Sequence, residues 1–234
     1  MQKEILNLLA EAARSIHIPL GDRELSLFDR YHGELILWNV RMNLTALRSS
    51  EDIVVKHFID SLTVLPFLPG PHVKLLDVGT GAGFPGIPLK IVLGSLKIHL
   101  LESSRKKISF LKKVVHTLSL EETIPIHGRA EDISKELPFQ STFDVVISRA
   151  TFRLPSWIEV GSPFLKQGGL LIAMKGAKVK EEVEEASKSI ERYGLSSKGC
   201  HDLRLPFTGH TRNIMIYEKI HEEMPQSDII NTCS

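Results

Sequence analysis

A glycine-rich segment is the part of this chain whose residue types and spacing could do chemistry. The apolar run Leu75–Val78 leads into a loop with glycine at positions 79, 81, 83 and 86. Glycine adopts positive φ angles freely and carries no side chain, so a ligand can approach the backbone of such a loop closely. A helix is predicted to follow, and we expect it to offer free N–H groups at its start. The segment therefore predicts a site for a nucleoside.

Two carboxylates flank the loop. Asp77 lies just before the first glycine, and Glu102 ends the next apolar run, 23 residues after Gly79. A carboxylate in the position of Glu102 can accept hydrogen bonds from both ribose hydroxyls of a bound nucleoside. We expect Asp77 to orient the loop and to face the amino-acid end of a cofactor.

Two cofactor classes fit this pattern. The glycine-x-glycine-x-x-glycine spacing from Gly81 satisfies the dinucleotide fingerprint, which would imply NAD. The alternating aspartate and glycines from Asp77 satisfy the loop of S-adenosylmethionine-dependent methyltransferases. The second interpretation is favoured because Pro85 would remove an N–H donor from the turn that must hold a pyrophosphate. NAD binding, and a glycine-rich turn without a ligand, remain the alternatives.

Composition is that of a soluble globular enzyme. The 234 residues are 42% hydrophobic and 24% charged, which is ordinary for such proteins. No apolar run approaches the roughly 20 residues of a membrane span, and the N-terminus lacks a signal-peptide profile. We expect a cytoplasmic protein that does not contact membranes. The two cysteines, Cys200 and Cys233, have no partners at zinc spacing, so we expect neither a disulfide framework nor a metal site.

Positive charge is concentrated in the second part of the chain. Residues 71–220 carry 22 Lys and Arg residues against 16 Asp and Glu, whereas residues 1–70 carry 7 against 9. Five of the basic residues lie on one predicted helix: Arg105, Lys106, Lys107, Lys112 and Lys113. This cluster is either a solvated face or a stripe that contacts nucleic-acid phosphates.

The order of elements predicts the architecture. Helical periodicity covers 4–16, 24–41 and 53–65, and a cluster of prolines near residue 70 ends this helical layer. Strands are then predicted at 73–78, 97–102, 123–127, 143–148, 169–175, 197–205 and 212–219. Helices are predicted at 85–94, 104–118, 155–165 and 179–193. The short link between the last two strands requires antiparallel pairing.

We therefore expect an α/β fold of the class I methyltransferase type, a Rossmann-like doubly wound sheet with a terminal antiparallel strand. Residues 1–70 form an N-terminal helical extension and residues 71–220 the methyltransferase domain. Residues 221–234 are acidic and poorly patterned, and we expect a disordered tail.

The residues after the fourth strand bear on the methyl acceptor. Residues 147–150 read Ile-Ser-Arg-Ala, without the Asn/Asp-Pro-Pro-aromatic sequence of amine methyltransferases or the cysteine of cytosine-C5 enzymes. A ring nitrogen such as guanine N7 has a free lone pair and needs no base. Arg149 could hold a guanine edge or a phosphate. Lys175 and Arg212, at the ends of two further strands, are placed for RNA contact. His57 and Asp60 share a helix face, which suits either a local hydrogen bond or substrate contact.

Five segments carry a resemblance to a known family. They are Asn-Leu-Thr-Ala at 43–46, Lys-His-Phe-Ile-Asp-Ser at 56–61, the loop at 77–88, Ser-Arg-Ala at 148–150 and Lys-Gly at 175–176. Over about residues 25 to 220 the chain resembles the bacterial 16S rRNA guanine-N7 methyltransferases, also called glucose-inhibited division protein B. The resemblance implies transfer of a methyl group from S-adenosylmethionine to N7 of one guanine near the decoding region. The substrate would be 16S rRNA or the small ribosomal subunit, and we expect a monomer.

The resemblance and the residues together give a set of expected site residues. The residues expected to act on the substrate are Arg149, Lys175 and Arg212. The residues expected to bind the cofactor are Asp77, Gly79, Gly81, Gly83, Phe84, Glu102, Ala130, Glu131 and Arg149. For Phe84 and Arg149 this role is what the resemblance alone implies. Two other functions stay open, a small-molecule methyltransferase that shares this cofactor site and a non-catalytic nucleoside- or RNA-binding module.

Overall fold

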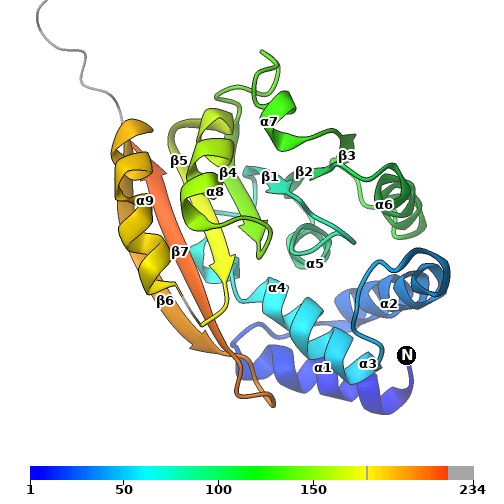
Figure 1. Cartoon of the computed structure of the whole chain (residues 1–234). Coiled ribbons are helices and arrows are strands. Elements are labelled where there is room, and N and C mark those ends of the chain that lie inside the picture. The colour runs from blue at the N-terminus through cyan, green and yellow to red at the C-terminus, as the bar shows by residue number, and fades with distance from the viewer. Residues whose placement is uncertain (178, 221–234) are drawn as a thin grey trace, which may run out of the picture.

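A seven-stranded sheet forms the middle of the protein. The computed structural model in Figure 1 describes residues 1–177 and 179–220. The strands are β1 (Lys74–Val78), β2 (Lys97–Glu102), β3 (Thr123–His127), β4 (Phe143–Arg149), β5 (Leu165–Lys175), β6 (Leu195–Arg204) and β7 (Thr211–Lys219). Their order in the sheet is β3-β2-β1-β4-β5-β7-β6. All seven correspond to predicted strands, and helices cover both faces of the sheet (Figure 1).

The direction of the strands follows the connections between them. β1 to β5 pair in parallel, because a helix or a longer segment separates each from the next. β7 runs antiparallel to both of its neighbours, β5 and β6. The predicted antiparallel pairing is confirmed, and the final strand lies inside the sheet rather than at its edge.

The helices that follow the strands are short. They are α5 (Gly86–Val92), α6 (Arg105–Thr117), α7 (Ala130–Ile133), α8 (Leu154–Gly161) and α9 (Lys180–Arg192). Four of them match predicted helices, whereas α7 was not predicted. Among the described residues, no helix is both long enough and apolar enough to cross a membrane.

The N-terminal layer contains one departure from a regular helix. Its elements are α1 (Lys3–Ser15), α2 (Asp22–Met42), α3 (Ser50–Ile53), the π-helix η1 (Val54–Ile59), α4 (Asp60–Leu62) and the 3₁₀ turn η2 (Leu65–Phe67). The prediction of one regular helix over 53–65 is therefore wrong in its middle. A π-helix has a wider turn, and such turns occur frequently at functional sites.

Side chains along a strand point alternately to the two faces of the sheet, so each face forms a hydrophobic core with the helices that cover it. Leu75 of β1 packs in one cluster with α5, α6 and the N-terminal helices, including Leu9 of α1 and Phe58 of η1. Leu76, on the opposite face, packs with α8 and α9. The N-terminal layer is thus continuous with the core on one side of the sheet. The division at residue 70 stays a prediction, and the predicted tail lies outside the described residues.

Candidate active site

Asp77 fixes the glycine loop from inside the protein. One oxygen of its buried carboxylate, Oδ2, accepts hydrogen bonds from Thr80 Oγ1 at 2.5 Å and from Gly86 N at 2.8 Å. The carboxylate therefore spans the whole loop. Burial raises the pKa of Asp77 to about 6, although the two hydrogen bonds lower it. The other oxygen, Oδ1, is buried and has no hydrogen-bond partner among the described residues.

The loop glycines are required for different reasons. Gly79, Gly81 and Gly83 have φ angles of 69°, 62° and 101°, which glycine adopts without strain. Gly86 has an ordinary φ, but a Cβ there would lie 2.9 Å from Asp77 Oδ2. The expectation of free N–H groups at the start of the next helix is wrong. The N–H of Gly86 is bonded to Asp77, and that of Ile87 to Gly83 O.

A cavity of about 270 Å³ lies at the carboxyl ends of β1, β2 and β3. We call it the Gly79 cavity. It is lined by Val78, Gly79, Leu101, Ser103, Gly128, Arg129, Ala130, Glu131, Thr151 and Phe152. In open α/β sheets this is the edge at which ligands bind.

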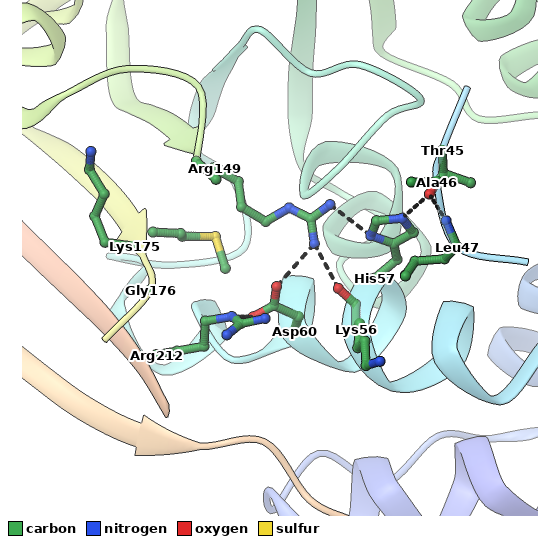
Figure 2. Close-up of a pocket in the computed structure, with 12 residues that line it drawn as sticks. Thr45, Ala46, Leu47, Lys56, His57, Asp60, Arg149, Lys175, Gly176 and Arg212 are labelled. Carbon is green, nitrogen blue, oxygen red and sulfur yellow. Dashed lines mark hydrogen bonds and ion pairs between the residues drawn. The ribbon is translucent and has the colours of Figure 1, made fainter. Parts of the chain in front are cut away.

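A second cavity, of about 550 Å³, surrounds the Arg149 side chain and is called the Arg149 cavity. It is lined by Thr45, Ala46, Leu47, Lys56, His57, Asp60, Arg149, Ala150, Met174, Lys175, Gly176 and Arg212. Figure 2 shows that these residues come from the N-terminal layer and from the ends of β4, β5 and β7. The two cavities meet at residues 149–152, since Arg149 and Ala150 line one and Thr151 and Phe152 line the other.

Arg149 is held by three groups of the N-terminal layer. Its Nη1 donates to the Lys56 carbonyl at 3.1 Å and to Asp60 Oδ2 at 3.0 Å, and its Nη2 donates to His57 Nδ1 at 3.0 Å (Figure 2). The guanidinium also lies over the Phe84 ring, with Cζ 5.1 Å from its centroid. The arginine side chain, only 15% exposed, is therefore fixed in place.

The protonation state of His57 follows from these partners. A guanidinium can only donate, so Nδ1 must accept and the ring proton is on Nε2. Nε2 is 2.7 Å from Thr45 Oγ1, to which it donates. Burial, and then the charge of Arg149, lower the pKa of His57 to about 3. His57 is therefore neutral near pH 7.

The π-helix explains why the backbone carbonyl of Lys56 can accept a hydrogen bond from Arg149. In an α-helix the N–H of Asp60 would bond to the carbonyl of Lys56, four residues earlier. Here the N–H of Asp60 bonds to the carbonyls of Val55 and His57. The Lys56 carbonyl can then accept from Arg149. The irregular turn thus helps to hold the arginine.

Asp60 joins two cations. Its carboxylate is 4% exposed and accepts from Arg149 through Oδ2 and from Arg212 Nε through Oδ1, the latter at 2.9 Å. Arg212 is 23% exposed and comes from the beginning of β7. The group of three side chains carries a net positive charge within the Arg149 cavity.

Comparison with known proteins gives the family. A family model described as rRNA small subunit methyltransferase G, GidB, matches residues 24–214. The chain belongs to this family. It is 45% identical over 213 residues to ribosomal RNA small subunit methyltransferase G of Syntrophus aciditrophicus, covering 91% of this chain and 88% of the relative. It is 39% identical over 219 residues to the protein of the same name from Acetivibrio thermocellus, covering 94% and 90%.

Solved structures show the fold of this methyltransferase G family member. The fold is similar to that of TYW2 from M. jannaschii in complex with AdoMet, with a TM-score of 0.55 and 17% identity over 69% of this chain and 76% of that one. Fibrillarin of Aeropyrum pernix, with S-adenosyl-L-methionine bound, gives a TM-score of 0.51 and 18% identity over 62% and 66%. The fold is that of class I S-adenosylmethionine-dependent methyltransferases.

The residues expected to act on the substrate all line the Arg149 cavity of this methyltransferase G family member. They differ in which groups already pair with their charges. Arg149 and Arg212 share Asp60. Lys175 is 10% exposed, and its Nζ donates to the Phe152 carbonyl and, at 2.8 Å, to Glu182. Its ammonium is therefore directed away from Asp60 (Figure 2).

Seven of the nine residues expected to bind the cofactor fall into two groups. Gly79, Ala130 and Glu131 line the Gly79 cavity. Asp77, Gly81, Gly83 and Glu102 build the loop beside it, and Glu102 accepts from the backbone N–H groups of Gly81 at 3.0 Å and Ser104 at 2.8 Å.

The other two cofactor candidates are placed differently: Arg149 lines the Arg149 cavity, and Phe84 packs beside it. The Phe84 ring stacks on His57, with centroids 4.4 Å apart, and supports Arg149. The cofactor role of Phe84 stays a prediction, and the ring itself packs against the residues of the Arg149 cavity.

Several residues at the cavities were absent from the expected set, among them His57 and Asp60, for which the sequence left a local hydrogen bond and a substrate contact open. Three others are Thr45, Tyr31 and Thr151. Thr45 is bonded to His57, Tyr31 donates its hydroxyl to the Ala82 carbonyl at 2.5 Å, and Thr151 Cγ2 lies 2.7 Å from the position of a Cβ on Gly79. Of these three, only Thr45 had a signal in the sequence, as part of the Asn-Leu-Thr-Ala segment.

The basic helix lies outside both cavities. α6 packs against β3 and α2, at the β3 end of the sheet (Figure 1). Arg149 ends β4, which lies on the other side of β1 in the strand order. Arg105, Lys106, Lys112 and Lys113 are exposed, while Lys107 lies 3.9 Å from Glu102. The solvated face and the phosphate contact both stay predictions for this helix.

Proposed function

We propose that this protein transfers the methyl group of S-adenosylmethionine to N7 of a guanine in 16S rRNA of the small ribosomal subunit. Family membership supports the reaction and the substrate class. We choose N7 as the methylated atom because no base is available among the described residues that line the Arg149 cavity.

The two groups that could act as a base there are both occupied. His57 is neutral, but its Nδ1 lone pair accepts from Arg149 and its Nε2–H donates to Thr45. Asp60 is 4% exposed, and each of its oxygens accepts from a guanidinium group, so taking up a proton there would weaken two ion pairs. An exocyclic amine or a hydroxyl would have to lose a proton on methylation, whereas guanine N7 has a lone pair and no proton to lose. The cavity therefore suits a ring nitrogen.

The Gly79 cavity fits the cofactor. A Cβ on Gly81 would meet nothing nearer than the Gly79 carbonyl at 4.0 Å, so space is open above the loop. Asp77 Oδ1 is buried beside the cavity and has no hydrogen-bond partner among the described residues, so its charge would attract a cationic group such as the α-ammonium of S-adenosylmethionine. Gly79, Ala130 and Glu131 would hold the nucleoside part, with Glu102 beside the loop. When bound, the cofactor supplies an electrophilic methyl group on its sulfonium.

The protein chiefly supplies orientation, because methyl transfer from a sulfonium is an in-line displacement. Residues 149–152 separate the cavities, and the acceptor base would lie on the Arg149 side of them. Arg149 and Arg212 would hold the base or its neighbouring phosphates, since guanidinium groups donate well to both. Lys175 would reach RNA only by leaving Glu182.

The direct test is transfer of labelled methyl to small subunits that lack their modifications, followed by nuclease digestion and mass analysis. Label in 7-methylguanosine is the expected result. Absence of label from every nucleoside, despite cofactor binding, would favour a small-molecule substrate or a binding module instead.

Binding to RNA phosphates predicts a strong dependence on salt. Affinity for small-subunit RNA should fall by orders of magnitude between about 50 and 200 mM salt, because each phosphate contact releases counterions. A small neutral substrate would show little change. We also propose that the protein acts as a cytoplasmic monomer, without a metal, and light scattering during gel filtration measures its oligomeric state.

A further inference from the structure

Thr45 presents a hydroxyl group to the Arg149 cavity. It lies in the segment after α2, three residues beyond Met42, where Asn43 turns the chain with a φ of 48°. Asn39, buried in α2, accepts the Thr45 backbone N–H through its Oδ1 at 3.0 Å. The position of the side chain is therefore set by the helix before it and by His57 beside it (Figure 2).

A chain of hydrogen bonds fixes the direction of the Thr45 hydroxyl. Arg149 can only donate, so His57 must accept at Nδ1 and donate from Nε2 to Thr45 Oγ1. The backbone N–H of Leu47 donates to the same oxygen at 3.1 Å. A hydroxyl oxygen has two lone pairs, and both are now occupied. Thr45 can accept no further bond, and its own proton remains to be donated.

We propose that Thr45 is a specificity-determining residue, whose hydroxyl donates to O6 of the guanine in the Arg149 cavity. The inference rests on the proposed function. Guanine presents O6 as an acceptor next to N7, whereas adenine presents an amino group there, which is a donor. A hydroxyl that can only donate bonds to the first and opposes the second. A donor to N7 would occupy the lone pair that the methyl group needs, so O6 is the partner.

The test combines a protein substitution with the removal of one substrate atom. Thr45→Val keeps the shape of the side chain and removes the hydroxyl, and Thr45→Ser restores it. The target guanine, once mapped, is replaced by 2-aminopurine, which keeps N7 and lacks O6. Methyl transfer to undermethylated small subunits with either base is measured as kcat/KM for the wild type and both variants.

We expect Thr45→Val to lower kcat/KM on guanine by about 10- to 100-fold, the range for one lost base contact. Thr45→Ser should retain most of the activity. The kcat/KM of the wild type should be at least 10-fold lower on 2-aminopurine than on guanine. On 2-aminopurine, Thr45→Val should be as active as the wild type, because this base has no O6 to which the Thr45 hydroxyl could donate. Binding of S-adenosylmethionine, measured by calorimetry, should be unchanged in both variants.

The outcomes separate this inference from the proposed function. Wild-type product without 7-methylguanosine overturns both. Normal 7-methylguanosine with an undiminished Thr45→Val rate overturns the role of Thr45 alone, as does an equal loss by Thr45→Val on both bases. If Thr45→Val fails to fold, the activity of the wild type on 2-aminopurine still tests the inference. Full activity on this base would exclude any hydrogen-bond donor to O6.

Discussion

At the scale of single residues, Asp60 is the group on which the Arg149 cavity depends. One nearly buried carboxylate holds two guanidinium groups that come from different strands. Removing one partner of a buried ion pair is costly because the remaining charge loses its counterion. Here the loss would leave two cations side by side.

We therefore expect Asp60→Asn to lower the free energy of unfolding by about 3 kcal/mol and to lower methyl transfer. Denaturant unfolding followed by circular dichroism measures the first effect. Asp52→Asn is the matched control, because Asp52 is 42% exposed and, among the described residues, its carboxylate forms an ion pair only with Lys56 one turn away. It should cost no more than about 0.5 kcal/mol. Equal losses in the two variants would exclude a special role for Asp60.

His57 makes stability depend on pH. Its pKa is about 3 in the folded protein against an ordinary 6.5. Between these values the unfolded chain binds a proton that the folded protein does not. The contribution of neutral His57 is thus fully present above pH 6.5 and is lost as the pH falls toward 3, at up to about 1.4 kcal/mol per pH unit.

The comparison with His57→Gln isolates this effect from other histidines. Glutamine can accept from Arg149 and donate to Thr45, but it does not titrate. We expect the stability of the wild type relative to His57→Gln to fall as the pH is lowered from about 7 to about 4, measured by denaturant unfolding at each pH. A difference that stays constant with pH would contradict this assignment.

At the scale of elements, the glycine loop is the segment that tolerates least change. Gly83 combines a φ of 101° with close neighbours, since a Cβ there would collide with the Ile87 side chain and lie 3.0 Å from the Tyr31 hydroxyl. We expect Gly83→Ala to lower the free energy of unfolding by about 2 kcal/mol and to weaken cofactor binding. Thermal unfolding and calorimetry measure the two effects.

Gly33 provides the control for this substitution. It lies inside the regular helix α2, and a Cβ added there would have no neighbour within 4 Å. Gly33→Ala should be neutral or stabilise by up to about 1 kcal/mol, because alanine favours helix. A Gly83→Ala protein as stable as Gly33→Ala, with normal cofactor affinity, would refute the role given to the loop.

The sequence predicts the regular elements well because hydrophobic periodicity reports directly on burial. All strands and the longer helices are found in this way. The π-helix over Val54–Ile59 is not found, because one extra residue in a helical turn barely changes an apolar pattern with a period near 3.6. What stabilises the wider turn is partly the bond from Arg149 to the Lys56 carbonyl, which comes from a residue 93 positions away. α7, with four residues, is too short for periodicity to reveal.

At the scale of the whole molecule, the N-terminal layer supports the glycine loop. Tyr31 of α2 is fully buried, and its hydroxyl donates to the Ala82 carbonyl within the loop. Burial raises the pKa of Tyr31 well above its ordinary value, so the hydroxyl keeps its proton. The contact links the N-terminal layer to the glycine loop, two parts of the chain that the sequence analysis assigns to different regions.

Tyr31→Phe should therefore lower the free energy of unfolding by about 1–2 kcal/mol, since the Ala82 carbonyl loses its donor in a buried place. Cofactor affinity, measured by calorimetry, should fall as well. Tyr193→Phe is the control, because the Tyr193 ring contacts Arg192 at the end of α9, far along the chain from the loop. Unchanged affinity in Tyr31→Phe would show that the layer does not support the loop.

The Arg149 cavity marks the limit of what the sequence predicts for the whole molecule. Because the carboxyl ends of parallel strands meet at one edge, the sequence indicates that Arg149 and Lys175 lie near each other. It marks Thr45, His57 and Asp60 through the resemblance, and His57 and Asp60 as one of two alternatives, but it does not indicate that they meet Arg149. Their place depends on how the N-terminal layer docks on the sheet, and that follows from packing between distant segments. Likewise, the ion pair between Lys175 and Glu182 depends on where α9 lies beside the end of β5.

The position of β7 has a consequence during synthesis of the protein on the ribosome. β6 is made before β7, yet its neighbour in the sheet is β7, which must insert between β5 and β6. A nascent chain that stops before residue 211 has neither this last pairing nor Arg212, the second cation on Asp60. Closing the sheet and completing the Arg149 cavity are therefore one event, which cannot take place before β7 has been synthesised.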